Sequence, residues 1–296
     1  MSEQNTMKRI DDDNFIMLPV VDFVFKLLFG DIKHKERLIS LLSTVLKLPK
    51  EVFAGIEIIN TELPRLFEED KKGILDIRAK LADGKQTDIE IQVLPSSFMP
   101  ERTLYYWAKM YTMQTKEGDT FDTLKKCITI NIVDYEFLPM KKMHTTYHLA
   151  EDETGHRLTD VLEVHFCELK KLRKGIDISD ADDPSLDWMR FIGARTKGEM
   201  EMLAQNNEAI KDAFDYLQVI SKDEEKRLAY ESRQLWLMDQ RTREKVAREE
   251  GKEEGRQEGK QERDVEIVKN LGAMGMSALD IAKATGLMVE QVEKLK

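Results

Sequence analysis

The sequence predicts an α/β protein with a helical extension at its C-terminus. Three patterns predict this class: period-two apolar alternation in residues 73–94, helix-like apolar spacing on both sides of that stretch, and a long charged segment after residue 220. Up to residue 135 the expected elements follow the order α-β-β-β-α-β, which is typical of a sheet covered by helices. With 296 residues, of which 41% are hydrophobic, the chain is long enough for one large core with appendages or for two domains.

The first helices and the first strand are predicted from apolar spacing and from helix-breaking residues. Residues 22–29 form an apolar helical run that ends at Gly30, and Asp22 stands where it can cap this helix. Residues 33–48 continue as an amphipathic helix that stops near the next proline. Residues 56–61 then form a short strand.

Residues 73–94 are predicted to form a hairpin with a three-residue turn. The apolar residues of both arms have odd numbers. If both apolar rows face one core, odd-numbered residues lie opposite each other, so the numbers of each opposed pair sum to an even number. A slip of one residue would turn every side chain to the other face. A loop of Ala82, Asp83 and a left-handed Gly84 meets this condition, whereas a two-residue loop does not. The apolar rows are Leu75, Ile77, Ala79 and Leu81 on the first arm and Ile89, Ile91 and Val93 on the second.

The polar face of this hairpin carries an unbalanced pair of charges. The register sets Arg78 opposite Asp88, where the two can neutralise each other, and Asp76 opposite Glu90, where like charges repel. A hard divalent cation such as magnesium fits between Asp76 and Glu90, with the main-chain carbonyl of Ile91 as a third oxygen ligand. The same residues are also consistent with a solvated strand face on which the two acids diverge into water.

The order of these residues resembles a nuclease signature. Asp76 followed by Glu90 and Gln92 is similar to the D, E-x-K signature of the PD-(D/E)XK nucleases, with Gln92 in the lysine position. About the first half of the chain further resembles the Rpn family of recombination-promoting nucleases and transposases, in which the glutamine variant is ordinary. The motifs that carry this resemblance are DFVFKLLFGD at 22–31, ILD at 74–76, IEIQ at 89–92 and RTLYYWAKMY at 102–111.

The resemblance implies a restriction-endonuclease-like core, in which helices flank a mixed sheet, and a metal-dependent DNA endonuclease. Asp76, Glu90 and Gln92 are the implied catalytic residues, and Asp22 is implied to lie beside them as an extra acid or orienting group. The implied cofactor is Mg²⁺, with Mn²⁺ or Ca²⁺ as alternatives, and the implied setting is recombination, mobile elements or phage defence. A catalytically silent DNA-binding or protein-interaction scaffold is the alternative function.

After the hairpin the patterns predict a helix over 101–114, a strand over 127–135, strands over 145–150 and 162–169, and helices over 186–220. The aromatic residues of the first of these helices are expected to pack against the sheet, while Arg102 and Lys109 can face a phosphate backbone. Three histidines lack the paired spacing with cysteine that zinc sites use, and they are interpreted as structural. The aromatic residues are Tyr105, Tyr106, Trp107 and Tyr111, and the histidines are His144, His148 and His165.

Composition restricts the partners and the compartment. The formal net charge of −10 argues mildly against a nucleic-acid partner, although a local basic groove can exist within an acidic protein. No segment has the apolar length of a membrane span, and the first residues lack a signal-peptide core. We therefore expect a cytoplasmic protein without membrane contact, in which Cys127 and Cys167 are reduced core residues.

The C-terminal part is predicted to be helical, so the expected domains are a nuclease-like domain over 1–220, a charged helical linker over 221–264 and a small helix-turn-helix-like unit over 265–296. In the linker, glycine recurs at 251, 255 and 259, each at a cost of about 1 kcal/mol relative to alanine. This stripe indicates either close helix packing in a homodimer or a flexible linker. The last unit has no arginine beyond residue 263, so protein contact is as consistent with it as DNA contact.

Overall fold

The computed structural model describes residues 14–63, 73–175 and 182–295 of the chain. Its centre is a mixed six-stranded sheet in the order β1-β4-β5-β6-β8-β7. The pairs β5/β6 and β6/β8 are parallel, and the pairs β1/β4, β4/β5 and β7/β8 are antiparallel. The strands are β1 Glu57–Ile59, β4 Ile77–Lys80, β5 Gln86–Gln92, β6 Cys127–Val133, β7 His144–Tyr147 and β8 Leu162–Glu168, with β2 Glu62–Leu63 and β3 Gly73–Ile74 in a separate two-stranded sheet. The predicted fold class is therefore confirmed.

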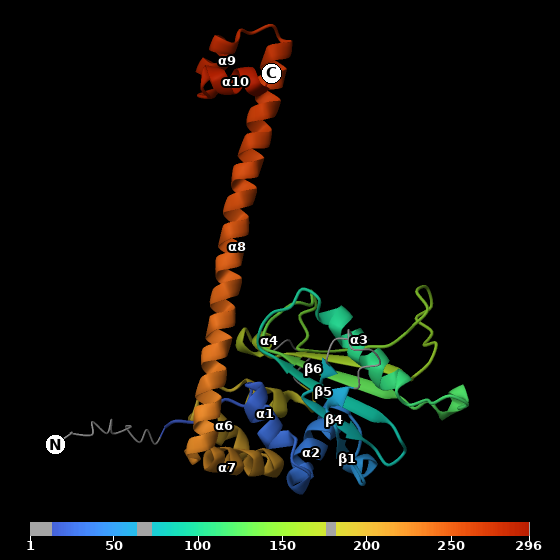
Figure 1. The fold of residues 1–296 in the computed structure, drawn as a ribbon. Helices are drawn as coiled ribbons and strands as arrows, with labels where there is room; N and C mark the ends of the chain where they lie inside the picture. Colours follow the sequence, from blue (N-terminus) through green and yellow to red (C-terminus); the bar gives the residue numbers. More distant parts are fainter. Residues whose placement is uncertain (1–13, 64–72, 176–181, 296) are drawn as a thin grey trace, which may run out of the picture. The chain divides into compact units, whose positions relative to one another are not determined.

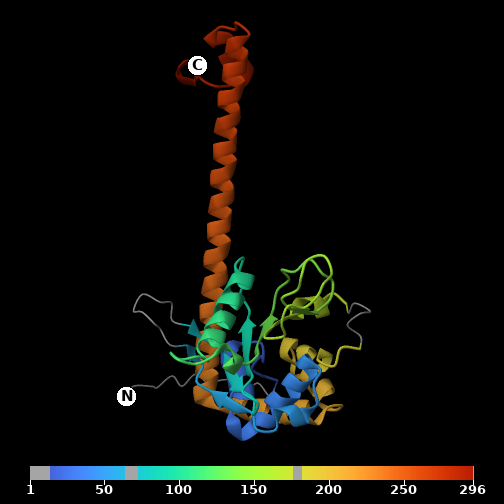
Figure 2. The same ribbon diagram turned by 90° about the vertical axis from the view of Figure 1, so that its right-hand side faces the viewer.

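Helices cover both faces of the sheet (Figure 1, Figure 2). One face packs on the main hydrophobic core, where Phe25 and Phe29 of α1 meet Trp188 of α5 and the inward residues of β5 and β6. The other face is covered by α3, whose Met110 contacts Leu75 and Cys127. The helices up to residue 222 are α1 Asp22–Phe29, α2 Lys35–Leu46, α3 Met99–Thr112, α4 Leu169–Arg173, α5 Leu186–Gly193, α6 Lys197–Ala204 and α7 Glu208–Lys222.

The register of the hairpin follows the parity argument. Ile77 pairs with Ile89 and Arg78 with Asp88, so opposed residues sum to the predicted even number. The Leu81 N–H donates to the Lys85 carbonyl at 2.8 Å, which leaves residues 82–84 as the loop. The prediction for Leu75 was wrong, because this side chain packs under α3 rather than in the main core. The chain leaves β3 and turns at residues 75–76 before β4 begins, and this turn interrupts the alternation.

The turn of the hairpin depends on Gly84, which has a φ of +89°. A Cβ at this position would also lie 3.2 Å from Cγ of Lys125. We expect Gly84→Ala to lower the free energy of unfolding by about 1–2 kcal/mol, the cost of a left-handed non-glycine residue. Urea unfolding measures this change. Gly198→Ala is the matched control, because a Cβ at Gly198 meets no atom within 4 Å, and a loss of similar size there would contradict the backbone explanation.

The aromatic residues of α3 mostly pack as expected. Tyr106, Trp107 and Tyr111 lie against the small cluster under α3, and the Trp107 Nε1–H donates to the Cys127 carbonyl at 3.0 Å. Tyr105 is the exception, because it is exposed and lies under the Nζ of Lys109 at 5.1 Å from the ring centroid. The prediction of sheet packing was therefore wrong for Tyr105, whose position on the helix turns it outward.

The edge strand β7 is joined to β8 by a chain of buried polar groups. Nε2 of His144 lies 2.9 Å from Nδ1 of His165. The other ring nitrogens contact carboxylates, at 3.1 Å for His144 and Asp183 and at 2.7 Å for His165 and Glu163. Because every ring nitrogen of the two histidines has a polar partner, this arrangement is typical of a structural role.

Residues 235–296 form a second compact unit, separate from residues 1–234. The helix α8, Glu224–Ala273, includes the glycine-punctuated segment, and α9, Ala278–Thr285, and α10, Val289–Leu295, follow it. Val268, Ile281 and Val292 form the centre of a small core between these helices. Gly286 ends α9 with a φ of +77°, as the predicted helix-turn-helix pattern requires. None of the helices in the described ranges combines the length and apolar character that a bilayer crossing demands.

Candidate active site

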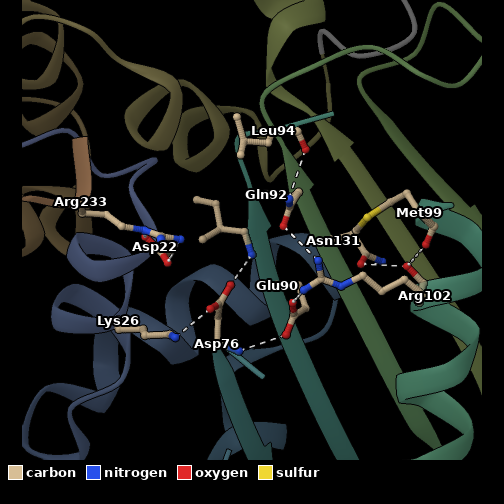
Figure 3. Close-up of polar contacts among 12 residues, drawn as sticks. Asp22, Lys26, Asp76, Glu90, Gln92, Leu94, Met99, Arg102, Asn131 and Arg233 are labelled. Carbon is tan, nitrogen blue, oxygen red and sulfur yellow. Dashed lines mark hydrogen bonds and ion pairs between the residues drawn. The ribbon is translucent and has the colours of Figure 1, made fainter. Parts of the chain in front are cut away.

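Asp76 and Glu90 lie side by side where β4 begins beside β5. The Asp76 N–H donates to Oε1 of Glu90 at 3.0 Å, and the Ile91 N–H donates to Oδ2 of Asp76 at 2.8 Å (Figure 3). Each carboxylate therefore accepts a main-chain hydrogen bond from the opposite arm. The register that sets Asp76 opposite Glu90 brings two acids into one site, as the sequence predicts.

Two basic side chains neutralise this pair. Nζ of Lys26, on α1, lies 2.9 Å from Oδ1 of Asp76, and Nη2 of Arg102, on α3, lies 3.0 Å from Oε2 of Glu90 (Figure 3). The guanidinium of Arg102 contacts both Glu90 and Gln92, and its contact with a phosphate backbone stays a prediction. Sequence analysis missed Lys26. The sequence feature that could have indicated Lys26 is its spacing of four residues from Asp22, which places Asp22 and Lys26 on one face of a helix.

Asp22 does not cap its helix. The helix α1 begins at Asp22 with Val21 as the cap residue, so the capping interpretation was wrong. Both carboxylate oxygens of Asp22 instead accept hydrogen bonds from Arg233, at 2.8 Å from Nε and 2.7 Å from Nη2 (Figure 3). Arg233 lies 211 residues away along the chain, and no sequence pattern joins the two.

Gln92 is the last residue of β5 and lies on the same face as Glu90. Its Nε2 donates to the Leu94 carbonyl at 3.2 Å, and its Oε1 accepts from Nη1 of Arg102 at 3.3 Å. Arg102 thus contacts the side chains of both Glu90 and Gln92. The amide of Gln92 lies at the carboxyl end of β5, next to the acidic pair (Figure 3).

The sequence of residues 19–247 matches a family model described as PD-(D/E)XK nuclease family transposase. The chain belongs to this family. No curated protein and no solved structure shows significant similarity to it. Membership indicates a nuclease-like or transposase-like function for this PD-(D/E)XK protein, and nucleases of this superfamily generally use divalent metal ions.

Burial dominates the electrostatics around Asp76 and Glu90 in this PD-(D/E)XK family protein. It raises the pKa of Asp76, although the ammonium of Lys26 and the hydrogen bond from Ile91 oppose the shift. Burial and the nearby charge of Asp76 raise the pKa of Glu90 to about 8, against the effect of Arg102. A metal ion at these oxygens would therefore compete with a proton at neutral pH.

Asp88 departs from the expected pairing with Arg78. The two residues are opposed in the register, but the Nη2 of Arg78 donates to Oε1 of Gln86 at 2.7 Å. Asp88 is fully buried, and neither of its oxygens has a hydrogen-bond partner among the described residues. Burial and the charges of Glu90 and Asp76 raise the pKa of Asp88 well above its usual range. The charge of Arg78 opposes this rise of the pKa, but the predicted direct pairing of Arg78 with Asp88 was wrong.

The residues of this site fit a hard divalent cation. Asp76 and Glu90 supply adjacent carboxylate oxygens, and magnesium binds through one or two carboxylates while it keeps several waters. Beside them on the same sheet lies Asp88, a buried acid whose oxygens have no hydrogen-bond partner among the described residues. Within the described ranges, no group of three or more histidine, cysteine or acidic side chains is arranged to hold a metal ion by itself. A cation bound here would therefore need water ligands as well.

Proposed function

We propose that this PD-(D/E)XK family protein is a divalent-metal-dependent DNA endonuclease that hydrolyses phosphodiester bonds. The observation that carries the proposal is the adjacent pair Asp76 and Glu90, joined by reciprocal main-chain hydrogen bonds in the register of the family signature. Asp76, Glu90 and the carbonyl of Ile91 would hold the ion, with Mg²⁺ as the first choice and Mn²⁺ or Ca²⁺ as alternatives. A bound ion lowers the pKa of water and stabilises charge on the scissile phosphate.

The protein side chains would then orient the substrate. Gln92 offers an amide N–H that can donate to a phosphate oxygen or to the attacking water once it leaves the Leu94 carbonyl. Asp22 would act as a neighbouring acid, since its charge contributes to the raised pKa of Asp76, after burial and against Lys26. DNA is the proposed substrate because the family is one of nuclease-type transposases, and recombination or mobile elements are the proposed setting.

Incubation of the purified protein with supercoiled plasmid tests this function. We expect nicked and linear DNA to appear with Mg²⁺ or Mn²⁺ and to be absent with EDTA. Gel electrophoresis separates the three plasmid forms. A folded protein that leaves the plasmid intact with every divalent ion would reject the endonuclease proposal.

A second candidate function is a catalytically silent DNA-binding or protein-interaction scaffold. The ion pairs of Lys26 with Asp76 and of Arg102 with Glu90 favour it, because they neutralise both acids without a metal ion. A scaffold of this kind would be indifferent to divalent ions. The two candidates therefore differ in a property that can be measured without a DNA substrate.

Metal-dependent stabilisation separates these candidates. We expect saturating Mg²⁺ to stabilise the wild-type protein by about 2–3 kcal/mol at 100 times its dissociation constant. Glu90→Gln should lose this stabilisation, since an amide provides only one neutral oxygen to the ion. Thermal unfolding with and without Mg²⁺ measures both. Asp83→Asn, which changes an exposed acid in the turn of the same hairpin, should keep the full effect. Equal stabilisation in Glu90→Gln would argue against this ligand.

A further inference from the structure

In the D, E-x-K signature that Asp76 and residues 90–92 resemble, the last position is a lysine, and this chain has Gln92 there. Hydrolysis of a phosphodiester increases the negative charge on the phosphate oxygens, and a preorganised cation near that charge contributes strongly to catalysis. Gln92 is neutral and cannot supply this charge. The basic side chains that the structure brings to the acidic pair are Lys26 and Arg102.

Arg102 is fixed by its contacts. Its guanidinium donates to Glu90 and to Gln92, and its Cζ lies 5.4 Å from the ring centroid of Tyr106. A guanidinium held on three sides serves to orient Glu90 and Gln92. Lys26 differs in its contacts, because among the described residues its ammonium pairs with Oδ1 of Asp76 alone. Its side chain is 41% exposed, against 35% for Arg102. Lys26 thus contacts a proposed metal ligand with a side chain that is partly exposed to solvent.

The position of Lys26 depends on Arg233. Asp22 and Lys26 are four residues apart on α1, a spacing at which an acid and a base ordinarily pair. Arg233 occupies both oxygens of Asp22, so Lys26 extends to Asp76 instead (Figure 3). The helix α1 therefore presents the lysine to the hairpin from the side opposite to Arg102.

We propose that Lys26 is a catalytic residue, whose ammonium contacts the scissile phosphate and supplies the positive charge that Gln92 lacks. This inference rests on the endonuclease function proposed above. In the step, the oxygen of a water bonds to phosphorus, and the bond from phosphorus to one ester oxygen breaks. The water releases a proton to solvent, and the departing alkoxide takes a proton from a second water. Lys26 remains protonated throughout and stabilises the charge on the phosphate oxygens.

Moving the lysine tests this role. We expect Lys26→Gln to reduce the rate of plasmid nicking in Mg²⁺ by about 10²–10³-fold, the usual cost of one preorganised donor to the transition state. The double variant Lys26→Gln with Gln92→Lys returns the charge to the signature position and should recover at least about tenfold of this loss. Lys85→Gln is the matched control, because Lys85 has the same 41% exposure and pairs with Asp83 at 2.7 Å on the same hairpin. It should nick DNA at the wild-type rate.

Calcium binding provides a second measurement that does not depend on turnover. Isothermal titration should show that Lys26→Gln binds Ca²⁺ at least as tightly as the wild-type protein, and up to several-fold more tightly. The reason is that the ammonium no longer competes for Asp76. Loss of Ca²⁺ binding in Lys26→Gln would show that the lysine only supports the site, and would overturn the inference. Wild-type activity in Lys26→Gln, or no recovery in a folded double variant, would overturn it as well. A wild-type protein that never cleaves DNA would instead reject the endonuclease function itself.

Discussion

Replacing Asp76 with asparagine is expected to reduce metal-dependent DNA cleavage by at least about 10³-fold. A bound divalent ion contributes several kcal/mol of charge stabilisation to the transition state, and each 1.36 kcal/mol corresponds to a factor of ten in rate. Asparagine keeps the shape of the side chain and an oxygen that can accept the Ile91 N–H, so the hairpin should remain folded. The loss should therefore reflect the missing charge. Rates of plasmid nicking in Mg²⁺ and Mn²⁺ measure it.

Two controls accompany this variant. Asp83→Asn removes one acid from the exposed turn of the same hairpin and should cleave at the wild-type rate. Thermal unfolding in EDTA should give similar midpoints for wild type and Asp76→Asn, because burial already raises the pKa of Asp76 and limits the contribution of its charge to folding. An Asp76→Asn protein that nicks DNA as fast as wild type would remove Asp76 from the active site.

Replacing Asp88 with asparagine is expected to stabilise the metal-free protein at alkaline pH. Burial raises the folded-state pKa of Asp88 well above its ordinary value, so folding favours the protonated acid. Below about pH 4, Asp88 is protonated in both the folded and the unfolded state. As the pH rises, Asp88 ionises first in the unfolded state, so the free energy of unfolding decreases. This decrease ends once the pH passes the pKa of Asp88 in the folded state. Asparagine does not titrate and avoids this loss. We expect a gain of at least about 1 kcal/mol at pH 8, because each tenfold increase in proton affinity on folding corresponds to about 1.4 kcal/mol.

Urea unfolding in EDTA across pH 5–8 tests the effect of Asp88. The difference between Asp88→Asn and wild type should widen steadily as the pH increases. Asp187→Asn changes a half-exposed acid on α5 and should leave the curve unchanged. A constant difference between Asp88→Asn and wild type at every pH would mean that Asp88 does not bind a proton on folding.

The hairpin could be predicted from the sequence because its register obeys a discrete rule. A slip of one residue would expose the apolar row of β5, so the loop of residues 82–84 and the opposition of Asp76 and Glu90 follow from local pattern. The rule applies only where the strand is continuous. Leu75 precedes β4 and follows β3, and the pairing of β3 with β2 is a non-local contact that alternation does not reveal.

The charges around the site depended on contacts between distant parts of the chain. Arg78 and Asp88 lie opposite each other in the register, which led to the prediction that they pair. In the structure the guanidinium of Arg78 instead donates a hydrogen bond to Gln86, on the same face. Lys26 reaches Asp76 from a helix fifty residues earlier in the chain, and its spacing from Asp22 predicts a different partner. The ion pair of Lys26 with Asp76 depends on how α1 packs on the sheet, and the spacing of apolar residues in the sequence does not reveal this packing.

The contact between Asp22 and Arg233 defines the shortest chain in which the site is complete. A protein truncated after α7, which ends at Lys222, keeps the sheet and every acidic residue of the site but loses Arg233. In such a protein we expect Asp22 to attract Lys26, one helical turn away on α1, and to draw the ammonium away from Asp76. We therefore expect the proposed catalytic function to require the first turns of α8 as well as the helices that end with α7.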